Sequence, residues 1–590
     1  MCLIFSVHRC SRGKIHSNVI VTNLMMFQYH VYTFSKKLRS KVHVPAKYSG
    51  NITINVERKA RNMLINRKTF FISLLVLIAN SEGLRVLVFF PMMSKSHSIL
   101  GQGVVSRLLE AGHEVVHITS YPRSKPEPRL RELNVSTIGE RLRDEMKNSA
   151  SDNPFALRNL VGKGNVGDSV LFLYFTYDLH RRVLEDKLVV DLLSDTNEHF
   201  DAVVIEWFFN DVVAGIAPLF KCPLIWFGST EAHWQVLQIM DEIPNPSYNV
   251  DIFSKSRSPL TFWERIMELW MIFKKSMMMN LVVVPFERLL YNRVFPSIAS
   301  KRGVTVPSYD EAIYNGSFLF LNSHPSIGTP FKLPQNAKYI AGYHINKEVN
   351  PLPKDLQILM DSAKHGVIYF SMGSNLQSSD MSEAMKDSLL KVFGQLKQTI
   401  IWKFEQDLPN VPSNVHLVKW APQASILSHP NLKVFITHGG QLSTTEAIHF
   451  AVPVVGIPVM ADQHVNMRSV ELKGSGLVVT LAEDMAPKVK IAVEEILQNP
   501  YHKKNAKEGS EIFHDRILPP GEELVHWVEY VVRTRGASHL RSPALGVPLY
   551  QKLYLDFIIV LITIVYLMVK FINVLRRKCS DYKSKKLKKN

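Results

Sequence analysis

The chain has 590 residues, 46% of them hydrophobic, which is enough for two or three ordinary folded domains. Its formal net charge of +18 at first suggests a nucleic-acid-binding protein. However, residues 1–62 carry 11 Lys and Arg against 1 acidic residue, and residues 576–590 carry 8 against 1, so the body keeps a net charge of only +1. A nearly neutral body argues against a nucleic-acid surface, and the basic ends need another explanation.

The first segment with a recognisable pattern is a secretory signal peptide at residues 63–81. A basic start, Met63-Leu-Ile-Asn-Arg-Lys68, precedes an apolar core and the small residues Ala79-Asn80-Ser81 at the cleavage position. Because signal peptides begin at the initiator methionine, we hypothesise that Met63 is the true start. Residues 1–62 would then be an N-terminal extension, and the sequence does not tell whether it is translated. A mature N-terminus found away from Glu82 by peptide sequencing would contradict this hypothesis.

The next elements place a histidine and a carboxylate after two predicted strands. Residues 84–90 are apolar enough for a buried strand, and the loop that follows ends in His97 before a probable helix. His97 is a candidate general base because imidazole titrates near neutral pH, although a lone loop histidine usually has no such role. The strand at 200–206 ends in Glu206, which could orient the base as the acid of a triad does, with Asp211 as the alternative.

Residues 261–295 are rich in methionine and aromatic side chains. Such a stripe usually forms the core face of a helix, and we expect a core face here. Methionine adapts to varied shapes, so the same segment could instead line a permissive pocket for small lipophilic molecules.

In the second half, polar groups follow three predicted strands in turn. One strand runs into Ser371-Met-Gly-Ser374, and the next ends at His438-Gly439-Gly440 before a helical pattern. The two glycines permit a tight turn that leaves free N–H groups above the strand, a natural site for an anion. Glu446 in the helix could hold a ribose diol, and a further strand leads to Asp462-Gln463. Since ligands bind at the carboxyl ends of strands in open α/β sheets, we expect these groups to share one crevice.

The stretch from Trp420 to Gln463 resembles the signature of the family 1 UDP-glycosyltransferases, the animal membrane-bound enzymes of the endoplasmic reticulum. The first half resembles the opening of that family, in which His97 would stand as the general base. Family members often carry Asp where this chain has Glu206. The resemblance implies that the donor is held by Trp420 and Gln423 at the uridine, by Glu446 at the ribose, by His438, Ser374, Gly439, Gly440 and Ser443 at the diphosphate, and by Asp462 and Gln463 at the sugar.

The resemblance also implies an α/β protein of the GT-B fold, with two Rossmann-like domains facing a cleft and a single C-terminal transmembrane helix. The alternation of short strands with helices in both halves independently favours parallel sheets. We therefore expect an acceptor-binding domain at 82–340, a UDP-sugar-binding domain at 341–518, closing helices at 519–552, a transmembrane helix at 553–574 and a basic cytosolic tail at 575–590.

One position departs from the vertebrate pattern and bears on the substrate. Vertebrate glucuronic-acid enzymes of the family tend to carry Asn where this chain has Leu442, whereas the invertebrate branch, which this chain resembles, tends to use UDP-glucose. The implied reaction is one inverting displacement, in which His97 takes a proton from a hydroxyl of a small lipophilic acceptor, UDP leaves and a β-glycoside forms. The chain shows no Asp-x-Asp, CxxC or HExxH pattern, so we expect no metal and no cofactor beyond the UDP-sugar co-substrate.

The C-terminus indicates a membrane protein. Residues 553–574 are apolar apart from Asp556, Lys570 and Asn573, and the basic tail that follows predicts a cytosolic tail and a lumenal body. The ending Lys586-Leu-Lys588-Lys-Asn590 resembles a retrieval signal of the endoplasmic reticulum. The sequons beginning at Asn134 and Asn315 could be glycosylated in a lumenal domain, and we expect a glycoprotein active in detoxification.

Two other classes of function stay open. One is a catalytically silent, membrane-anchored binding protein on the same fold, favoured only by Glu206 and Leu442. The other is a nucleotide-dependent oxidoreductase, which is disfavoured because neither half shows GxGxxG after its first strand. The sequence marks neither the acceptor nor the oligomeric state, so a homo-oligomer is also possible.

Overall fold

The computed structural model describes residues 83–149, 156–162, 170–240, 245–254, 256, 259–346 and 348–587. The predicted extension at 1–62 and signal peptide at 63–81 lie outside the described residues. Residues Gly83–Asn590 form one unit, separate from Met1–Glu82.

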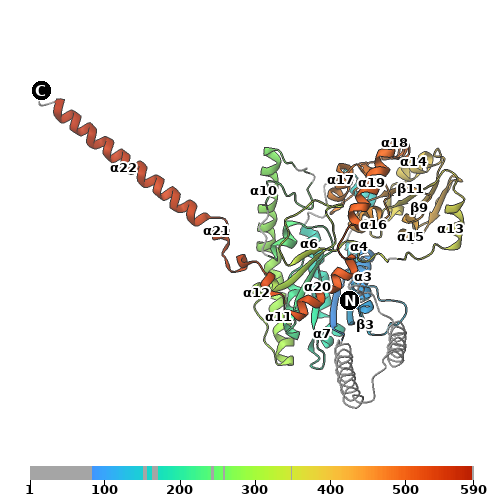
Figure 1. Cartoon of the computed structure of the whole chain (residues 1–590), viewed down its shortest axis with the longest axis horizontal. Helices are drawn as coiled ribbons and strands as arrows, with labels where there is room; N and C mark the ends of the chain where they lie inside the picture. Colours follow the sequence, from blue (N-terminus) through green and yellow to red (C-terminus); the bar gives the residue numbers. More distant parts are fainter. Residues whose placement is uncertain are drawn as a thin grey trace, which may run out of the picture. The chain divides into compact units, whose positions relative to one another are not determined.

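Seven described strands form the first sheet, and all of its neighbouring strands pair in parallel (Figure 1). Their order in space is β3-β2-β1-β4-β5-β6-β7, so the direction of winding reverses between β1 and β4. In open α/β sheets a ligand crevice forms where the order reverses, beyond the carboxyl ends of the two strands. The strands are β1 (Arg85–Phe90), β2 (Glu114–Thr119), β3 (Leu130–Asn134), β4 (Ala202–Trp207), β5 (Leu224–Gly228), β6 (Gly316–Leu321) and β7 (Ala337–Tyr339).

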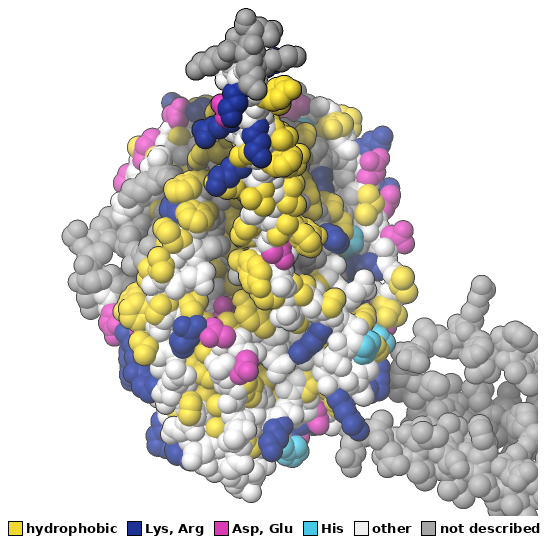
Figure 2. All heavy atoms as spheres, turned by 90° about the vertical axis from the view of Figure 1, so that its left-hand side faces the viewer, with side chains coloured by type: hydrophobic (Ala, Val, Ile, Leu, Met, Phe, Trp, Pro, Cys, Tyr) yellow, Lys and Arg dark blue, Asp and Glu magenta, His cyan; other side chains and the backbone are white. Residues whose placement is uncertain are grey.

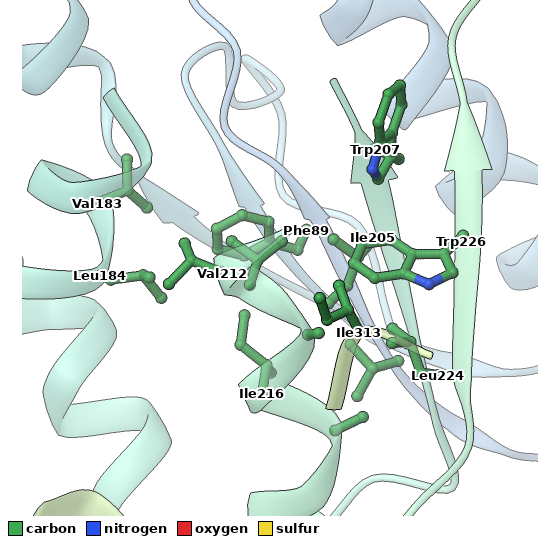
Figure 3. Close-up of a cluster of buried hydrophobic side chains, with 14 of the residues drawn as sticks. Phe89, Val183, Leu184, Ile205, Trp207, Val212, Ile216, Leu224, Trp226 and Ile313 are labelled. Carbon is green, nitrogen blue, oxygen red and sulfur yellow. The ribbon is translucent and has the colours of Figure 1, made fainter. Parts of the chain in front are cut away.

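Helices cover both faces of this sheet, which is why β4 is buried along its whole length. On one face Phe89, Ile205 and Trp226 pack with side chains of the neighbouring helices (Figure 3). The elements are α3 (Lys95–Glu110), α4 (Ser136–Ser149), α5 (Leu157–Leu160), α6 (Val170–Glu185), α7 (Lys187–Ser194), η2 (Val212–Gly215), α8 (Ile216–Phe220), α9 (Trp234–Gln238), α10 (Phe262–Met278), η3 (Met279–Val283), α11 (Val284–Arg302) and α12 (Tyr309–Ile313).

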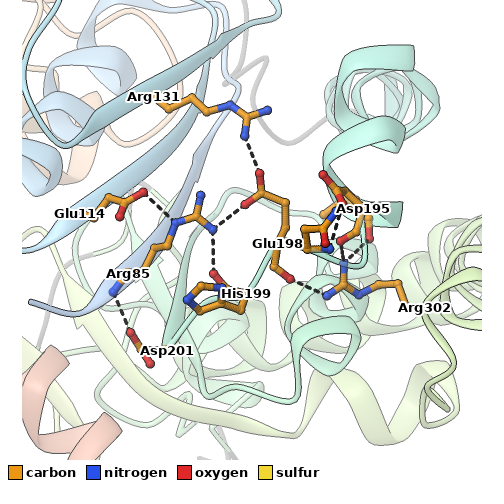
Figure 4. A network of polar contacts seen from close by, with 10 residues as sticks. Arg85, Glu114, Arg131, Asp195, Glu198, His199, Asp201 and Arg302 are labelled. Atoms are coloured by element: carbon orange, nitrogen blue, oxygen red, sulfur yellow. Dashed lines mark hydrogen bonds and ion pairs between the residues drawn. The ribbon is translucent and has the colours of Figure 1, made fainter. Parts of the chain in front are cut away.

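The amino end of the first sheet, opposite the crevice, is held by a network of charges (Figure 4). Arg85 opens β1 and pairs with Glu114 of β2 at 2.8 Å, and Arg85 and Arg131 both meet the Glu198 carboxylate at 2.5 Å. Arg302, at the end of α11, donates to the Glu198 carbonyl at 2.7 Å. Burial opposes the charge of Glu198, but the two guanidinium groups outweigh it and lower its pKa. The network ties three strands and α11 together below the crevice.

Six described strands form the second sheet in the order β10-β9-β8-β11-β12-β13, again all parallel, and here the winding reverses between β8 and β11. Its strands are β8 (Val367–Ser371), β9 (Thr399–Lys403), β10 (Val415–Val418), β11 (Leu432–Thr437), β12 (Val454–Gly456) and β13 (Gly476–Val478). The accompanying helices are α13 (Lys354–Asp361), η4 (Ser378–Asp380), α14 (Glu383–Phe393), α15 (Gln423–Leu427), α16 (Gln441–His449), α17 (Gln463–Leu472), α18 (Met485–Gln498) and α19 (Pro500–His514).

After α19 the chain returns to the first half. Helix α20 (Pro520–Arg533) buries Leu524, Val528 and Val531 in the same core as strands of the first sheet, and Trp527 stacks on Phe318 with 4.7 Å between ring centroids. The chain therefore crosses between the halves twice.

The chain ends in a long apolar helix, α22 (Leu555–Leu587), after η5 (Ser538–Leu540), η6 (Pro543–Gly546) and α21 (Leu549–Lys552). An 18-residue window of α22 has a mean hydropathy of 2.6 and is wholly unburied, so the helix is long and apolar enough to cross a membrane. The helix begins two residues after the predicted span and continues through most of the predicted basic tail.

The prediction that residues 261–295 form a core face is wrong for α10 and the start of α11. The buried residues of α10 are the charged Glu268 and Lys275, whereas Trp263 and Leu269 are 72% and 58% exposed. Met267 and Met277 are exposed as well. Hydrophobic composition favours a buried face, but it does not tell what covers that face.

Candidate functional site

The winding reversal in the first sheet brings His97 and Glu206 together. His97 follows β1 and Glu206 lies near the carboxyl end of β4, and these two strands are direct neighbours. His97 lies in the first turn of α3 and not in the predicted loop, because the extended backbone of Ser94 lets the helix begin at Lys95. Nδ1 of His97 contacts Oε1 of Glu206. The predicted pair is thus formed in the structure.

The electrostatics of His97 suit a base. Burial of the ring opposes its charge, but the Glu206 carboxylate outweighs burial and raises the pKa of His97 above its ordinary 6.5. The edge of the Phe208 ring meets the imidazole with 4.6 Å between centroids. With Nδ1–H donated to Glu206, Nε2 of the neutral ring is left as the acceptor for a proton.

The other candidates of the first half lie elsewhere. Asp211, the alternative partner of His97, accepts from Trp207 Nε1 at 2.6 Å, and burial raises its pKa to about 6. His113 accepts from the Leu84 N–H at 3.1 Å, and His117 is fully buried on β2. Both histidines have structural contacts within the first half.

On the donor side, the register of the second sheet aligns two loops. Ser371 of β8 pairs with Thr437 of β11, so Gly373 and His438, which follow them, lie side by side. Gly373 has a φ of +87°, and a Cβ there would lie 2.4 Å from Cε1 of His438. Only glycine lets the Ser371–Ser374 loop approach the imidazole this closely.

His438 and the start of α16 lie where the sequence predicts an anion site. Burial, with Lys403 nearby, lowers the pKa of His438 to about 4, so its ring is neutral and can donate a hydrogen bond without gaining a proton. Gly439 has a φ of +82°, and Gly440 is the N-cap of α16 in extended conformation. Ser374 is half-buried in the neighbouring loop. N–H groups at the N-terminus of α16 and the neutral His438 suit a diphosphate.

Gln423, Ser443 and Glu446, three residues that the family resemblance places around the donor, form one hydrogen-bonded cluster. Nε2 of Gln423 donates to Glu446 Oε2 at 2.7 Å and to Ser443 Oγ at 3.1 Å. Burial raises the pKa of Glu446 to about 7, although the bond from Gln423 acts in the opposite direction. The cluster sets a carboxyl group and an amide next to the anion site, as a nucleoside requires.

Asp462 and Gln463 lie beyond the carboxyl end of β12, at the start of α17. Asp462 accepts from Asn466 Nδ2 at 2.7 Å, and Gln463 Oε1 accepts the N–H groups of Val459 and Met460 at 2.9 and 3.0 Å. Burial raises the pKa of Asp462, and His97 acts on it in the opposite direction. The carboxylate of the second half therefore lies close enough to the base of the first half to influence its titration.

Trp420, the last of the predicted donor-site residues, lies at the boundary between the halves. Its ring is 51% exposed, and Nζ of Lys95 lies 3.7 Å from the ring centroid. Gln441 adds a second link, because its Nε2 donates to the Asn322 carbonyl at 2.9 Å. The donor-side residues and the His97–Glu206 pair thus face each other across the contact of the two halves.

Comparison with known proteins agrees with this geometry. The family model described as UDP-glucoronosyl and UDP-glucosyl transferase matches residues 85–589. The chain belongs to this family. It is 30% identical over 530 residues to UDP-glucosyltransferase 2 of Dactylopius coccus, with 87% of this chain and 98% of that protein covered. It is 33% identical over 315 residues to UDP-glucuronosyltransferase 2B15 of Rattus norvegicus, with 53% and 57% covered. The chain is therefore a UDP-sugar glycosyltransferase.

The fold of this glycosyltransferase also matches solved structures. Arabidopsis thaliana UGT89C1, solved in complex with quercetin, aligns with a TM-score of 0.50 and 16% identity over 77% of this chain and all of that chain. The two parallel sheets and this structural neighbour confirm the predicted GT-B fold, and the predicted apolar C-terminal helix is present as a candidate membrane span.

Four residues of the glycosyltransferase site were missed by the sequence analysis. Lys95 covers Trp420, and Asn466 holds both Asp462 and the Gly439 carbonyl. Gln441 bridges the halves, and His344 lies buried with Nε2 3.9 Å from Glu446 Oε1. Of these four, only Asn466 could have been found from the sequence, because it follows Asp462 by four residues and so lies one helical turn away from it. Leu442, at the position that departs from the vertebrate pattern, packs partly against the core of the first half.

Proposed function

We propose that this glycosyltransferase moves glucose from UDP-glucose to a hydroxyl group of a small lipophilic acceptor and inverts the configuration, giving a β-glycoside. The observation that carries the proposal is the His97–Glu206 pair of the first half, which faces Asp462 and the anion site of the second. The proposal of glucose is supported by Leu442 and by the name of the Dactylopius coccus relative.

The proposed mechanism is one in-line displacement. His97 Nε2 accepts the proton of the acceptor hydroxyl, whose oxygen attacks the anomeric carbon as UDP leaves from the opposite face. Glu206 stabilises the imidazolium that forms, as the acid of a triad does. Charge on the leaving diphosphate is met by neutral His438, by the loop carrying Ser374 and by the N-terminus of α16. Because these donors already supply the stabilisation, we propose that the reaction needs no metal ion or further cofactor.

The aromatic surroundings of the base support a lipophilic acceptor. Phe172 contacts Phe208, Phe209 and Phe253 edge-on, with ring centroids 5.7, 5.5 and 6.5 Å apart. Phe208 itself touches His97. An apolar lining with one polar group at its end is the usual character of a site for a small molecule.

We further propose that α22 anchors the chain in the membrane of the endoplasmic reticulum, with the catalytic body in the lumen and the tail in the cytosol. The apolar character of α22, the basic residues after it and the predicted signal peptide support this orientation. Asn134 and Asn315 are both exposed, as glycosylation in the lumen requires.

The test of the function is release of UDP by the membrane-bound full-length chain. Acceptor-dependent release from UDP-glucose with a panel of small phenols is the expected result, with slower release from UDP-glucuronic acid. A preference for UDP-glucuronic acid would overturn the donor assignment. Binding of UDP without turnover of any donor would show the alternative, a catalytically silent binding protein on the same fold.

Trp420→Ala is expected to raise the KM for the UDP-sugar by about 5- to 150-fold and to leave kcat nearly unchanged. Stacking of a base on an aromatic ring contributes about 1–3 kcal/mol, and this binding is the same in ground and transition states. Trp420→Phe is the matched control, because it keeps a ring and should retain most of the affinity. Equal KM values for the alanine variant and the wild type would remove Trp420 from the uridine site.

A further inference from the structure

Helices α10 and α11, joined by the π turn η3, form a continuous helical segment, Phe262–Arg302, with an unusual distribution of side chains. Twelve large hydrophobic side chains between Phe262 and Leu289 are exposed, among them Trp263, Trp270, Phe273 and Leu281. Figure 2 views the molecule from the side on which α10 lies, and the hydrophobic side chains gathered there include those of α22, which projects toward the viewer. We call these twelve side chains the outer face of α10–α11. A surface this apolar indicates a contact that the described residues do not supply.

The inner face of the same segment is charged and buried. Lys275 Nζ pairs with Asp251 Oδ1 at 2.5 Å, and Glu268 accepts from the Asp251 N–H at 2.9 Å. Glu287 accepts from the Tyr309 hydroxyl. Moving these charges into hydrocarbon would be costly, so the segment does not cross a membrane, although its length and composition would suffice.

A helix that is anchored on one side and apolar on the other fits the surface of a bilayer. Trp, Phe and Leu are the residues that interfacial helices place at the boundary between headgroups and acyl chains. If α22 anchors the chain in a membrane, that membrane is the bilayer available to this helix. Arg541 is tied to Asn315 at 2.9 Å, and the 13 residues between Arg541 and Leu555 span at most about 45 Å. The first half, which carries the outer face, is thus held near the membrane at high effective concentration.

We propose that the outer face of α10–α11 docks into the interfacial region of the lipid bilayer that holds α22, with the segment lying along the membrane. This proposal rests on the anchoring by α22 proposed above. The first half of the enzyme then has two attachments to the membrane, one covalent through the chain and one through its own surface.

The test places a fluorescent reporter on the outer face. Leu269→Cys, in a full-length chain whose other cysteines are replaced by serine, is labelled with an environment-sensitive dye and reconstituted in phosphatidylcholine vesicles. We expect a blue-shifted emission and strong quenching by lipids spin-labelled at acyl carbon 5, with weaker quenching at carbon 12, because interfacial helices insert only about 5–10 Å. Ile491→Cys on α18, 66% exposed against 58% for Leu269, is the matched control and should remain unquenched.

Each of the remaining outcomes would contradict one part of the proposal. An unquenched Leu269 label on a chain that resists carbonate extraction would overturn the docking and keep the anchor. Release of the chain by carbonate would overturn the anchor itself. Stronger quenching at carbon 12 would show deep insertion, and energy transfer between labelled copies without lipid quenching would show that a second copy covers the face.

A second variant tests the aromatic side chains. Trp263→Ser with Trp270→Ser is expected to abolish quenching of the Leu269 label while the chain still resists carbonate. Both rings are exposed, so the substitutions should not unfold the protein, and UDP release in detergent serves as the check. Quenching that persists at the wild-type level would overturn the role of these rings in docking.

Discussion

Replacing His97 by alanine is expected to lower kcat/KM by about 10²- to 10⁴-fold, which is the usual contribution of a positioned general base. The affinity for UDP should not change, because the residues proposed to hold UDP belong to the second half. His97 contacts Glu206 and Phe208, whereas Asp462 of the second half acts on it through its charge. Acceptor-dependent UDP release measures the first quantity, and calorimetric titration with UDP measures the second.

The matched control for this prediction is His365→Ala. His365 is exposed on the turn before β8, so its removal should leave both quantities unchanged. Full activity in His97→Ala, with a normal affinity for UDP, would show that another group accepts the acceptor proton.

Replacing Glu206 by glutamine is expected to lower kcat/KM by roughly 10²- to 10⁴-fold and to move the acidic limb of the pH profile. The amide keeps the shape of the side chain but loses its charge, so burial is then opposed by the charge of Asp462 without that of Glu206, and the pKa of His97 falls. A base must be unprotonated to work, and activity is therefore lost as the pH falls through that pKa. The limb should lie above pH 6.5 in the wild type and below it in the variant.

The pH dependence of kcat/KM for the free enzyme measures this shift. Asp211→Asn is the control, since Asp211 lies beside Trp207 and not beside His97. Its limb should coincide with that of the wild type. If the acidic limb moved in Asp211→Asn and stayed at its wild-type position in Glu206→Gln, then Asp211, and not Glu206, would be the carboxylate that acts on His97.

The positions of these residues could be predicted because each motif lies at the carboxyl end of a strand and these strands are neighbours in a sheet. Parallel strands direct their carboxyl ends to one edge, so a polar residue just after a strand is placed once the strand is recognised. This is why His97 meets Glu206 and why His438 lies beside Gly373. The cluster of Gln423, Ser443 and Glu446 followed from the motif in the same way.

Three features were not predictable from the same reasoning. The outer face of α10–α11 has the composition of a core, and only the folded structure tells that nothing in the described chain covers it. The return of α20 depends on contacts between residues far apart in sequence, such as Trp527 and Phe318. His344 belongs to no motif and reaches Glu446 only because the chain passes between the halves at that point.

The return of α20 means that the two halves do not depend on a single connection. A protease that cuts once between β7 and α13 leaves α20 buried in the core of the first half, so the nicked enzyme should stay one particle in size-exclusion chromatography. For the same reason the enzyme lends itself to being made as two polypeptides divided near residue 347. The second piece would carry, in Leu524, Val528 and Val531, the apolar surface by which it recognises the first.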